Sequence, residues 1–378
     1  MEEWKEYKLG EITNMKNGKK RPQSNGVFPV YGGNGIMDYS DSYNAENAII
    51  VGRVGAYCGC VYKCDGKCWV SDNAISVFAK DIVDTQFLYY LMTTVDFHHH
   101  HIGGAQPLMT QDIIGDFTVS IPPLSVQNQI VHILKSFDDK IEVNRRINDN
   151  LEQQAQALFK SWFVDFEPFK NGEFVESELG MIPKGWRVVE LSNLAEISKV
   201  SINPFKQPRT VFEHYSIPSY DNGMKPEIQL GEDIKSNKFV IENKMILFSK
   251  LNPRIKRVWY VDNLGVTPVC STEFVPYKAI GESKSSFLYG LINSQEFYDF
   301  VMSMVNGATG SHQRFHPEES LKYKVAYNEE YCERYSAIIT PVINQILVIR
   351  DESRRLAELR DTLLPKLMSG ELKVNEIA

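Results

Sequence analysis

The sequence of 378 residues has no run of about 18 consecutive apolar residues, the length that a helix needs to cross a membrane. Residues 1–4 also lack the basic and apolar regions of a secretory signal peptide. The six cysteines are unevenly placed, and cytosolic proteins of this size rarely depend on disulfides. These absences predict a cytoplasmic protein without a membrane partner.

Catalytic motifs are missing as well. The sequence contains no glycine-rich phosphate loop ending in Gly-Lys-Ser/Thr and no Gly-x-Gly-x-x-Gly at the start of a helix. The run Ile121-Pro-Pro-Leu124 lacks the polar residue before the prolines and the aromatic residue after them that amino-methylating enzymes use. The sequence therefore predicts a protein that is not an enzyme, with no catalytic residue and no cofactor of its own.

Net positive charge is also absent. The 41 basic residues are outnumbered by 48 acidic residues, so the formal net charge is −7. Any nucleic-acid partner would have to be bound by basic residues that gather locally. A composition of 43% hydrophobic and 24% charged residues is ordinary for a folded chain, and the length allows two or three domains.

Two clusters of metal-ligand residue types have unusual spacings. Cys58, Cys60, Cys64 and Cys68 do not form the paired two-residue gaps of a zinc site. The histidines of residues 98–101 are adjacent, whereas ligands on a helix prefer a spacing of four. We interpret the clusters as reduced cysteines and a solvated helix end, with no bound metal; a metal-dependent enzyme is the alternative.

A coiled-coil pattern extends from Leu124 to about Phe163. Apolar residues recur at alternating steps of four and three, and the same spacing returns 205 residues later without insertion or deletion. Asn144 and Asn148 are polar residues within the first copy, typical of positions that fix register and partner. The apolar seam is predicted at Ile130, Leu134, Phe137, Ile141, Leu151, Leu158, Val342, Ile346, Ile349, Leu356 and Leu363.

Such a helix of about 40 residues would be roughly 60 Å long, more than a globular core requires. Each copy needs a partner for its apolar stripe, and the obvious partner is the other copy. The alternative is two unrelated amphipathic helices, each buried in its own domain. Pro341 falls inside the second copy and is expected to break or kink that helix near Thr340.

A mixed α+β lobe precedes each helix. In the first lobe, Asp65-Gly66 is a hairpin signal, and a helix is expected from about Thr85 to His100. The second lobe repeats the opening of the first, with Trp186 in the place of Trp4. The predicted parts are a lobe at 1–123, a helix at 124–165, a linker at 166–184, a lobe at 185–327, a helix at 328–370 and a tail at 371–378.

Basic and amide side chains are concentrated in glycine-rich, irregular segments of both lobes. Arginine and lysine bind phosphates or guanine, and asparagine and glutamine can read adenine. Each segment alone is typical of a solvated surface, but their recurrence in both lobes favours DNA binding. The candidates are Lys19, Lys20, Arg21, Tyr31, Asn34, Arg53 and Gln106 in the first lobe, and Lys250, Asn252, Arg254, Lys256, Arg257, His312, Gln313 and Arg314 in the second.

Several longer motifs together resemble the specificity subunits of type I restriction-modification systems, along essentially the whole chain. The motifs of the first lobe lie at Val30–Ile36, Val51–Gly55, Trp69–Ile75, Gly104–Pro107 and Ile121–Leu124. Those of the helices and of the linker lie at Lys140–Ile147, Ala157–Pro168, Ile182–Trp186 and Leu356–Gly370.

The resemblance implies two α/β target recognition domains separated by two long helices that pack as an antiparallel coiled coil, with a pseudo-twofold repeat. Each domain would read one half of a bipartite site in double-stranded DNA, while the helices set the gap. Similar subunits bind two copies of an adenine-N6 methyltransferase subunit, which holds S-adenosylmethionine, and motor-nuclease subunits can join. The alternative function is a coiled-coil scaffold whose lobes bind proteins.

Overall fold

The computed structural model describes residues 4–102, 107–281, 284–305 and 313–376. The chain forms two compact units: residues 1–142 with 355–378, and residues 143–354. The division between these units crosses both long helices. Each unit therefore contains one lobe and one end of each helix.

A six-stranded sheet forms the lobe of the first unit, with strand order β2-β7-β5-β6-β3-β4. Neighbouring strands are antiparallel except β3 and β6, which are parallel. A separate pair joins β1 to β8. The strands are β1 (Lys5–Lys8), β2 (Thr13–Asn17), β3 (Phe28–Gly32), β4 (Gly35–Ser40), β5 (Ala45–Gly52), β6 (Val61–Val70), β7 (Ala74–Ala79) and β8 (Thr118–Ile121).

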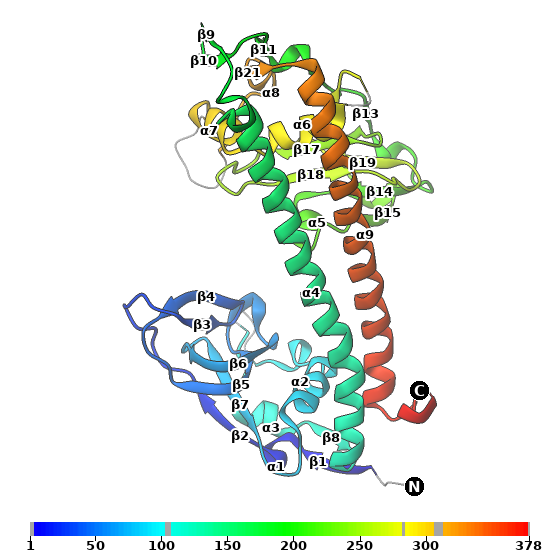
Figure 1. Cartoon of the computed structure of the whole chain (residues 1–378). Helices are drawn as coiled ribbons and strands as arrows, with labels where there is room; N and C mark the ends of the chain where they lie inside the picture. The colour runs from blue at the N-terminus through cyan, green and yellow to red at the C-terminus, as the bar shows by residue number, and fades with distance from the viewer. Residues whose placement is uncertain (1–3, 103–106, 282–283, 306–312, 377–378) are drawn as a thin grey trace. The chain divides into compact units, whose positions relative to one another are not determined.

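Helix α2 (Thr85–Thr94) lies between this sheet and the first long helix (Figure 1). The Asp84 side chain caps α2 by accepting hydrogen bonds from the amides of Gln86 and Phe87, both at 2.9 Å. Alternate residues of β5, such as Ile49 and Val51, face the core that contains α2. The lobe also has α1 (Leu9–Ile12), α3 (Gln111–Asp116) and 3-10 turns at Gly55–Tyr57 and His98–His100.

Two local predictions for this lobe are wrong. Asp65-Gly66 is not a hairpin turn, because β6 continues through it to Val70. Gly66 has φ of +93° and its amide donates to Asn47 Oδ1 at 2.7 Å, so the two residues form a bulge between β5 and β6. Helix α2 ends at Thr94, and the histidines that follow form a separate 3-10 turn.

The lobe of the second unit has a four-stranded sheet, β12-β20-β17-β18, and a five-stranded sheet, β13-β16-β19-β14-β15. Two further pairs join β9 to β10 and β11 to β21. The strands are β9 (Phe174–Ser177), β10 (Gly180–Pro183), β11 (Arg187–Glu190), β12 (Ala195–Ile197), β13 (Ser201–Ile202), β14 (Val211–Tyr215), β15 (Glu227–Leu230), β16 (Lys238–Val240), β17 (Met245–Ser249), β18 (Val258–Val261), β19 (Pro268–Ser271), β20 (Phe274–Ala279) and β21 (Lys324–Tyr327).

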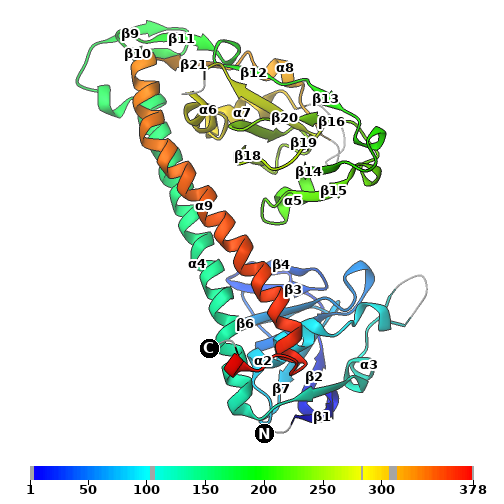
Figure 2. The ribbon, with the colours of Figure 1, turned by 90° about the vertical axis from the view of Figure 1, so that its right-hand side faces the viewer.

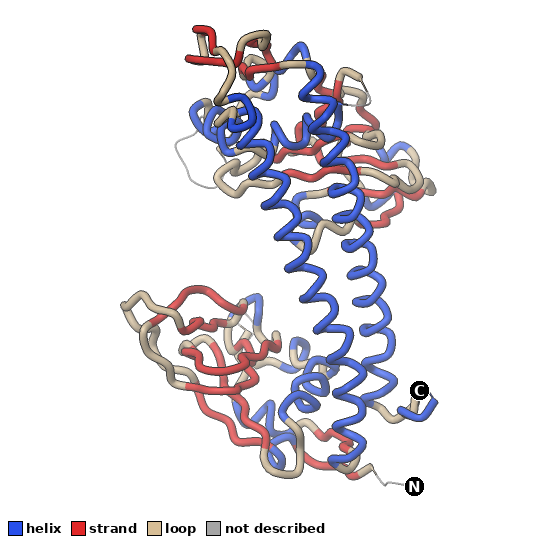
Figure 3. The backbone as a smooth tube through the Cα atoms, in the orientation of Figure 1, coloured by secondary structure: helices blue, strands red, loops and turns tan. Residues whose placement is uncertain are grey.

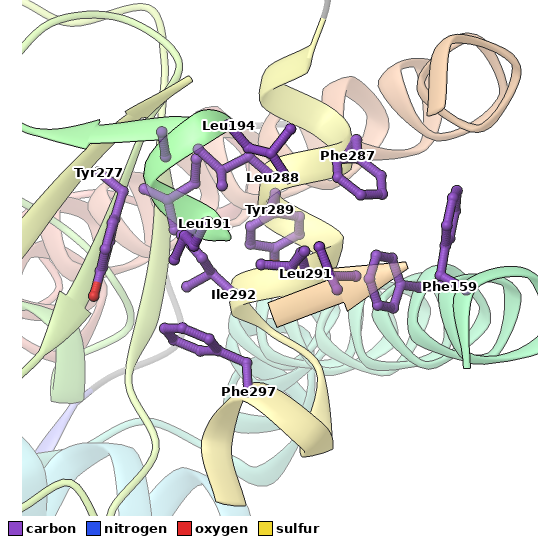
Figure 4. Close-up of a cluster of buried hydrophobic side chains, with 14 of the residues drawn as sticks. Phe159, Leu191, Leu194, Tyr277, Phe287, Leu288, Tyr289, Leu291, Ile292 and Phe297 are labelled. Carbon is purple, nitrogen blue, oxygen red and sulfur yellow. The ribbon is translucent and has the colours of Figure 1, made fainter. Parts of the chain in front are cut away.

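The core of the second unit surrounds α6 (Ser285–Ile292), all of whose residues are buried. Figure 4 shows Leu288 and Leu291 of α6 among side chains from the sheet and from the long helix, including Tyr277 and Phe159. The remaining helices are α5 (Ile217–Asp221), α7 (Gln295–Ser303) and α8 (Pro317–Ser320), with 3-10 turns at Glu167–Phe169, Leu191–Asn193, Pro204–Lys206 and Gly231–Asp233.

The two long helices, α4 (Leu124–Phe163) and α9 (Glu329–Met368), lie side by side (Figures 1 and 2). In the first unit, Asp138 of α4 accepts a hydrogen bond from Arg360 of α9 at 2.7 Å. In the second unit, Asn144 donates to Ser353 Oγ at 3.2 Å, and Tyr335 donates to the carbonyl of Ala155 at 3.2 Å. Partner numbers fall along α9 as they rise along α4, which confirms the predicted antiparallel pair.

The predicted seam residues differ in burial. Ile130, Leu134, Ile346 and Ile349 are buried. The remaining seam residues are half-buried: Phe137, Ile141, Leu151, Leu158, Val342, Leu356 and Leu363. Phe159 and Ile343, the chain neighbours of Leu158 and Val342, are fully buried instead, because the ends of the helices pack against the lobes as well as against each other.

Pro341 does not interrupt α9, which corrects the expected break. Figure 3 shows α9 as one continuous helix, and its helical residues run through Pro341. The proline lacks an amide to donate to the carbonyl of Ala337, but both residues are exposed. Water can therefore hydrogen-bond to the carbonyl that loses its partner.

The predicted internal repeat is confirmed in the connections of both lobes. Strands β3 and β6 pair in parallel through Tyr31 and Val70, and β14 and β19 pair in parallel through Tyr215 and Cys270. The opening tryptophans are also equivalent: Trp4 packs against Gly370 after α9, and the Trp186 ring lies 5.5 Å from that of Phe166 after α4. The α+β class with two repeated lobes is thus as expected.

None of the described helices combines the length and the hydropathy needed to cross a membrane.

Candidate nucleic-acid interface

Three loops of the first unit meet where β5 ends. The Arg53 amide donates to the carbonyl of Asn73 at 2.9 Å, and the Arg53 carbonyl accepts from the Met109 amide at 2.8 Å. Gly33, in the turn between β3 and β4, packs against the main chain of Asn73 and Val54. The fold thus gathers loops that are far apart in the sequence.

Glycines allow the close main-chain packing of these loops. A Cβ atom on Gly52 would lie 2.1 Å from the carbonyl oxygen of Tyr57, and a Cβ atom on Gly18 would lie 1.9 Å from that of Ser71. Gly18 precedes the basic run, and the Lys19 amide donates to the Val70 carbonyl at 3.0 Å. The basic run is thereby held beside the turn that contains Asn73.

We call Lys19, Asn34, Arg53 and Asn73 the first loop cluster. Lys19, Asn34 and Asn73 are exposed, and Arg53 is half-buried. No described residue accepts a hydrogen bond from the buried Nε of Arg53. The guanidinium of Arg53 therefore has a donor, Nε, that is buried and has no acceptor among the described residues.

The other candidates of the first lobe differ from these four. Lys20 and Arg21 are exposed, and Arg21 forms an ion pair with Asp38 of β4. Tyr31 is 8% exposed, its hydroxyl donates to the Lys63 carbonyl at 3.3 Å, and burial raises its pKa. Tyr31 therefore belongs to the core and not to a binding surface. Gln106 lies outside the described residues.

The second unit has a corresponding group of loops after β17. The Lys250 amide donates to the Glu273 carbonyl at 2.9 Å, and the Asn252 amide donates to the Gln313 carbonyl at 2.9 Å. Arg314 donates two hydrogen bonds to the Glu273 carboxylate, at 3.0 and 2.9 Å. These bonds hold the pKa of Glu273 below its usual value. We call Lys250, Asn252, Glu273 and Arg314 the second loop cluster.

Two basic candidates of the second lobe are engaged inside the unit. The Lys256 ammonium donates to the Asn293 carbonyl at 2.6 Å, and burial lowers its pKa. Arg257 is 8% exposed and donates to both carboxylate oxygens of Asp221, at 2.7 and 2.8 Å. The structure thus removes both residues from the predicted surface. Arg254 is exposed and adjoins them, and His312 lies outside the described residues.

Asn73 and Glu273 were not predicted as site residues. Asn73 lies within the motif Trp69–Ile75, and Glu273 follows it by 200 residues, an offset similar to those of other repeated segments. Each of them accepts a main-chain hydrogen bond from a basic residue, Asn73 from Arg53 and Glu273 from Lys250. The sequence pattern alone could not reveal these hydrogen bonds.

The cysteine and histidine clusters lie beside the first loop cluster. All six cysteines are thiols, and the Cys58 thiol lies 3.5 Å from the Arg53 carbonyl. His98 Nδ1 is 3.0 Å from the Cys58 carbonyl. Within the described residues, no three histidine, cysteine or carboxylate side chains gather in an arrangement that could hold a metal ion.

Residues 1–153 match the family model described as type I restriction modification DNA specificity domain. The MjaIX specificity subunit of Methanocaldococcus jannaschii is 29% identical over 324 residues, covering 80% of this chain and 72% of that protein. The HindI specificity subunit of Haemophilus influenzae is 24% identical over 462 residues, covering 98% of this chain and 100% of that protein.

Residues 1–153 thus resemble the DNA specificity domain of type I restriction-modification systems, and the whole chain is similar to specificity subunits of those systems. Its fold is shared by the crystal structure of the S subunit of the type I restriction-modification system from M. genitalium. That comparison covers 97% of this chain and 96% of the other, with a TM-score of 0.58 and 16% sequence identity. The repeated lobes and paired helices are therefore a fold that the S subunit from M. genitalium shares.

Proposed function

We propose that this chain is a type I restriction-modification specificity subunit and that it recognises a bipartite site in double-stranded DNA, with one half read by each lobe. The observation that carries the proposal is the repetition of the loop cluster at the end of β5 and of β17. Both clusters combine a basic side chain with polar groups that hydrogen-bond to base edges. The target recognition domains would be residues 1–123 and 185–327.

In this proposal the paired helices set the gap between the half-sites. Each helix has 40 residues and is thus roughly 60 Å long. Two readers on a stiff spacer engage one face of a duplex together when their half-sites are about 10 bp or a multiple of that apart. Binding of the first half then raises the effective concentration of the second reader, so the two specificities multiply.

We further propose that the helices bind two methyltransferase subunits. Val143 and Ile147 of α4 are 48% and 40% exposed, and together with Leu151 they line a shallow groove of about 270 Å³. On α9, Ile338 and Val348 are 48% and 63% exposed. Apolar side chains at helical spacing on an exposed face favour a helical partner.

The chemistry would belong to the partners. The methyltransferase subunits would hold S-adenosylmethionine and modify adenine N6, and motor-nuclease subunits can join the complex. The specificity subunit itself would be non-catalytic and would act in the cytoplasm, where its DNA target lies.

The test is DNA binding by the full chain purified with its methyltransferase partner. Binding that weakens steeply with salt and that is restricted to one class of sequences would support the proposal. Capture of proteins without any sequence-restricted DNA binding would instead support a scaffold with two protein-binding lobes.

A further inference from the structure

The hydrogen bonds of the two loop clusters identify equivalent residues in the two lobes. After β5, the Arg53 amide donates to the Asn73 carbonyl; after β17, the Lys250 amide donates to the Glu273 carbonyl, both at 2.9 Å. Arg53 is therefore equivalent to Lys250, and Asn73 to Glu273, although different residues fill these places.

The next residue along the chain supports the same alignment. Val54 forms an antiparallel bridge with Leu108, and Leu251 forms one with Arg314. Leu108 and Arg314 each follow a glycine-rich segment, so the bridges join the same two loops in each lobe. Arg314 of the second lobe thus occupies the position that the apolar Leu108 has in the first lobe.

We infer that these equivalent positions form the base-reading subsite of each lobe, and that their different chemistry makes the two half-sites different. Arg53 and Asn73 would read one half; Glu273, oriented by Arg314, and Lys250 would read the other. This inference rests on the proposed function and adds to it the residues that select bases.

The first subsite offers hydrogen-bond donors to a purine. Arg53 is half-buried, and its buried Nε has no acceptor among the described residues. A guanidinium presents a planar pair of donors that matches O6 and N7 of guanine, and an asparagine such as the exposed Asn73 matches N6 and N7 of adenine. This subsite therefore favours purines on the strand that it contacts.

The second subsite offers a fixed acceptor. The Glu273 side chain is 28% exposed, and both of its oxygens accept from Arg314. A carboxylate has about four acceptor sites, so two remain for an exocyclic amino group. Glutamate accepts from N4 of cytosine and cannot donate to a carbonyl oxygen. This subsite therefore selects a base with an amino group and rejects thymine, while Lys250 can donate to a neighbouring base or phosphate.

The experiment maps methylated adenines in DNA modified by the full chain together with its methyltransferase partner. The variants are Arg53→Lys, which loses the planar pair of donors, and Glu273→Gln, which keeps the shape but can donate as well as accept. Lys5→Ala and Lys322→Ala are matched controls, because they remove exposed lysines from β1 and from the turn after α8. Neither control lysine belongs to a loop cluster.

Each variant is expected to relax one base position in one half-site, by about 10-fold to 100-fold in relative methylation, and to leave the other half-site unchanged. The two variants should affect opposite halves, and the controls should retain the wild-type motif. A uniform fall at all sites, without a change of motif, would assign these residues to structure or to phosphate contact and overturn the inference. A wild-type complex that methylates no bipartite motif would refute the proposed function itself.

Discussion

At the scale of single residues, internal ion pairs decide which basic side chains remain available for the proposed DNA partner. Arg257 ends a basic run in the sequence, yet it is paired with Asp221, which lies 36 residues earlier. The sequence pattern showed where basic residues are concentrated, but it could not reveal partners that the fold brings from distant segments. The side chains of Lys250 and Arg53 remain available, because the main-chain hydrogen bonds of these residues hold the loops in place.

The pair between Arg257 and Asp221 yields a stability prediction. Asp221→Ala should destabilise the protein by about 3 kcal/mol, because it leaves a buried guanidinium without its counter-charge. Arg257→Met, which removes the charge and fills the space, should cost much less. Thermal unfolding of the two variants measures this difference, and Lys322→Ala, which breaks an exposed pair with Glu319, is the control. Equal melting temperatures for Asp221→Ala and the wild type would contradict the assignment.

The pair between Glu273 and Arg314 yields a pH prediction. Hydrogen bonds from Arg314 lower the pKa of the folded carboxyl below its ordinary value of 4.5. The native state therefore binds this proton less tightly than the unfolded chain does. The pair stabilises the fold above the unfolded pKa of about 4.5, and this stabilisation is lost as the pH falls through the lower folded pKa. Melting temperatures should favour the wild type over Glu273→Gln at neutral pH and should converge below pH 4.5. A difference that does not change with pH would refute the electrostatic origin.

At the scale of elements, the contacts of the long helices with the lobes are unequal. In the first unit, Tyr90 of α2 donates to Asp138 of α4 at 2.5 Å, and Asp138 also accepts from Arg360 of α9. In the second unit, the place of Tyr90 is taken by Gly290 of α6, which packs against Phe159 and Tyr335. At this position the first junction thus has hydrogen bonds and the second has aromatic packing.

Heptad spacing predicted both helices and their pairing, because an apolar stripe of that period requires a partner helix. Spacing could not predict the burial of Phe159 and Ile343, because these residues lie beside the seam and pack against the core of the second lobe. The hairpin expected at Asp65-Gly66 failed for a related reason: a glycine with positive φ fits a bulge as well as a turn. Local signals therefore predicted the elements better than their ends.

The aromatic junction yields a packing prediction. Alanine favours a helix over glycine, yet a Cβ atom on Gly290 would lie 2.5 Å from the Tyr335 hydroxyl and 2.8 Å from the Phe159 ring. Gly290→Ala should therefore destabilise the second unit by about 1–3 kcal/mol through overpacking. Thermal unfolding measures the loss, and adding Tyr335→Phe should restore part of it by removing the hydroxyl. An increase in melting temperature for Gly290→Ala would contradict the overpacking, because it would show that the junction accommodates the added methyl group without strain.

At the scale of the whole molecule, the chain repeats one design of lobe and helix. The first lobe contacts the end of α9 through Trp4 and Gly370, and the second lobe contacts the end of α4 through Trp186 and Phe166. Each lobe therefore packs against the end of the long helix that follows the other lobe in the sequence. The halves differ in their sheets, in their junctions and in the chemistry of their loops, and the difference between the loops suits the proposed reading of two unlike half-sites.

The paired helices are proposed to set the distance between the two lobes that read DNA. The most direct test deletes residues 145–151 from α4 and 346–352 from α9, which face each other in the register that joins Asn144 to Ser353. Each helix becomes shorter by roughly 10 Å at about 1.5 Å per residue, equivalent to about 3 bp of DNA.

The measurement is methylation, by the complex with its methyltransferase partner, of a DNA library that carries the wild-type half-sites at every gap length. We expect unchanged half-sites and an optimal gap about 3 bp shorter. A folded, active variant that keeps the wild-type gap would contradict it.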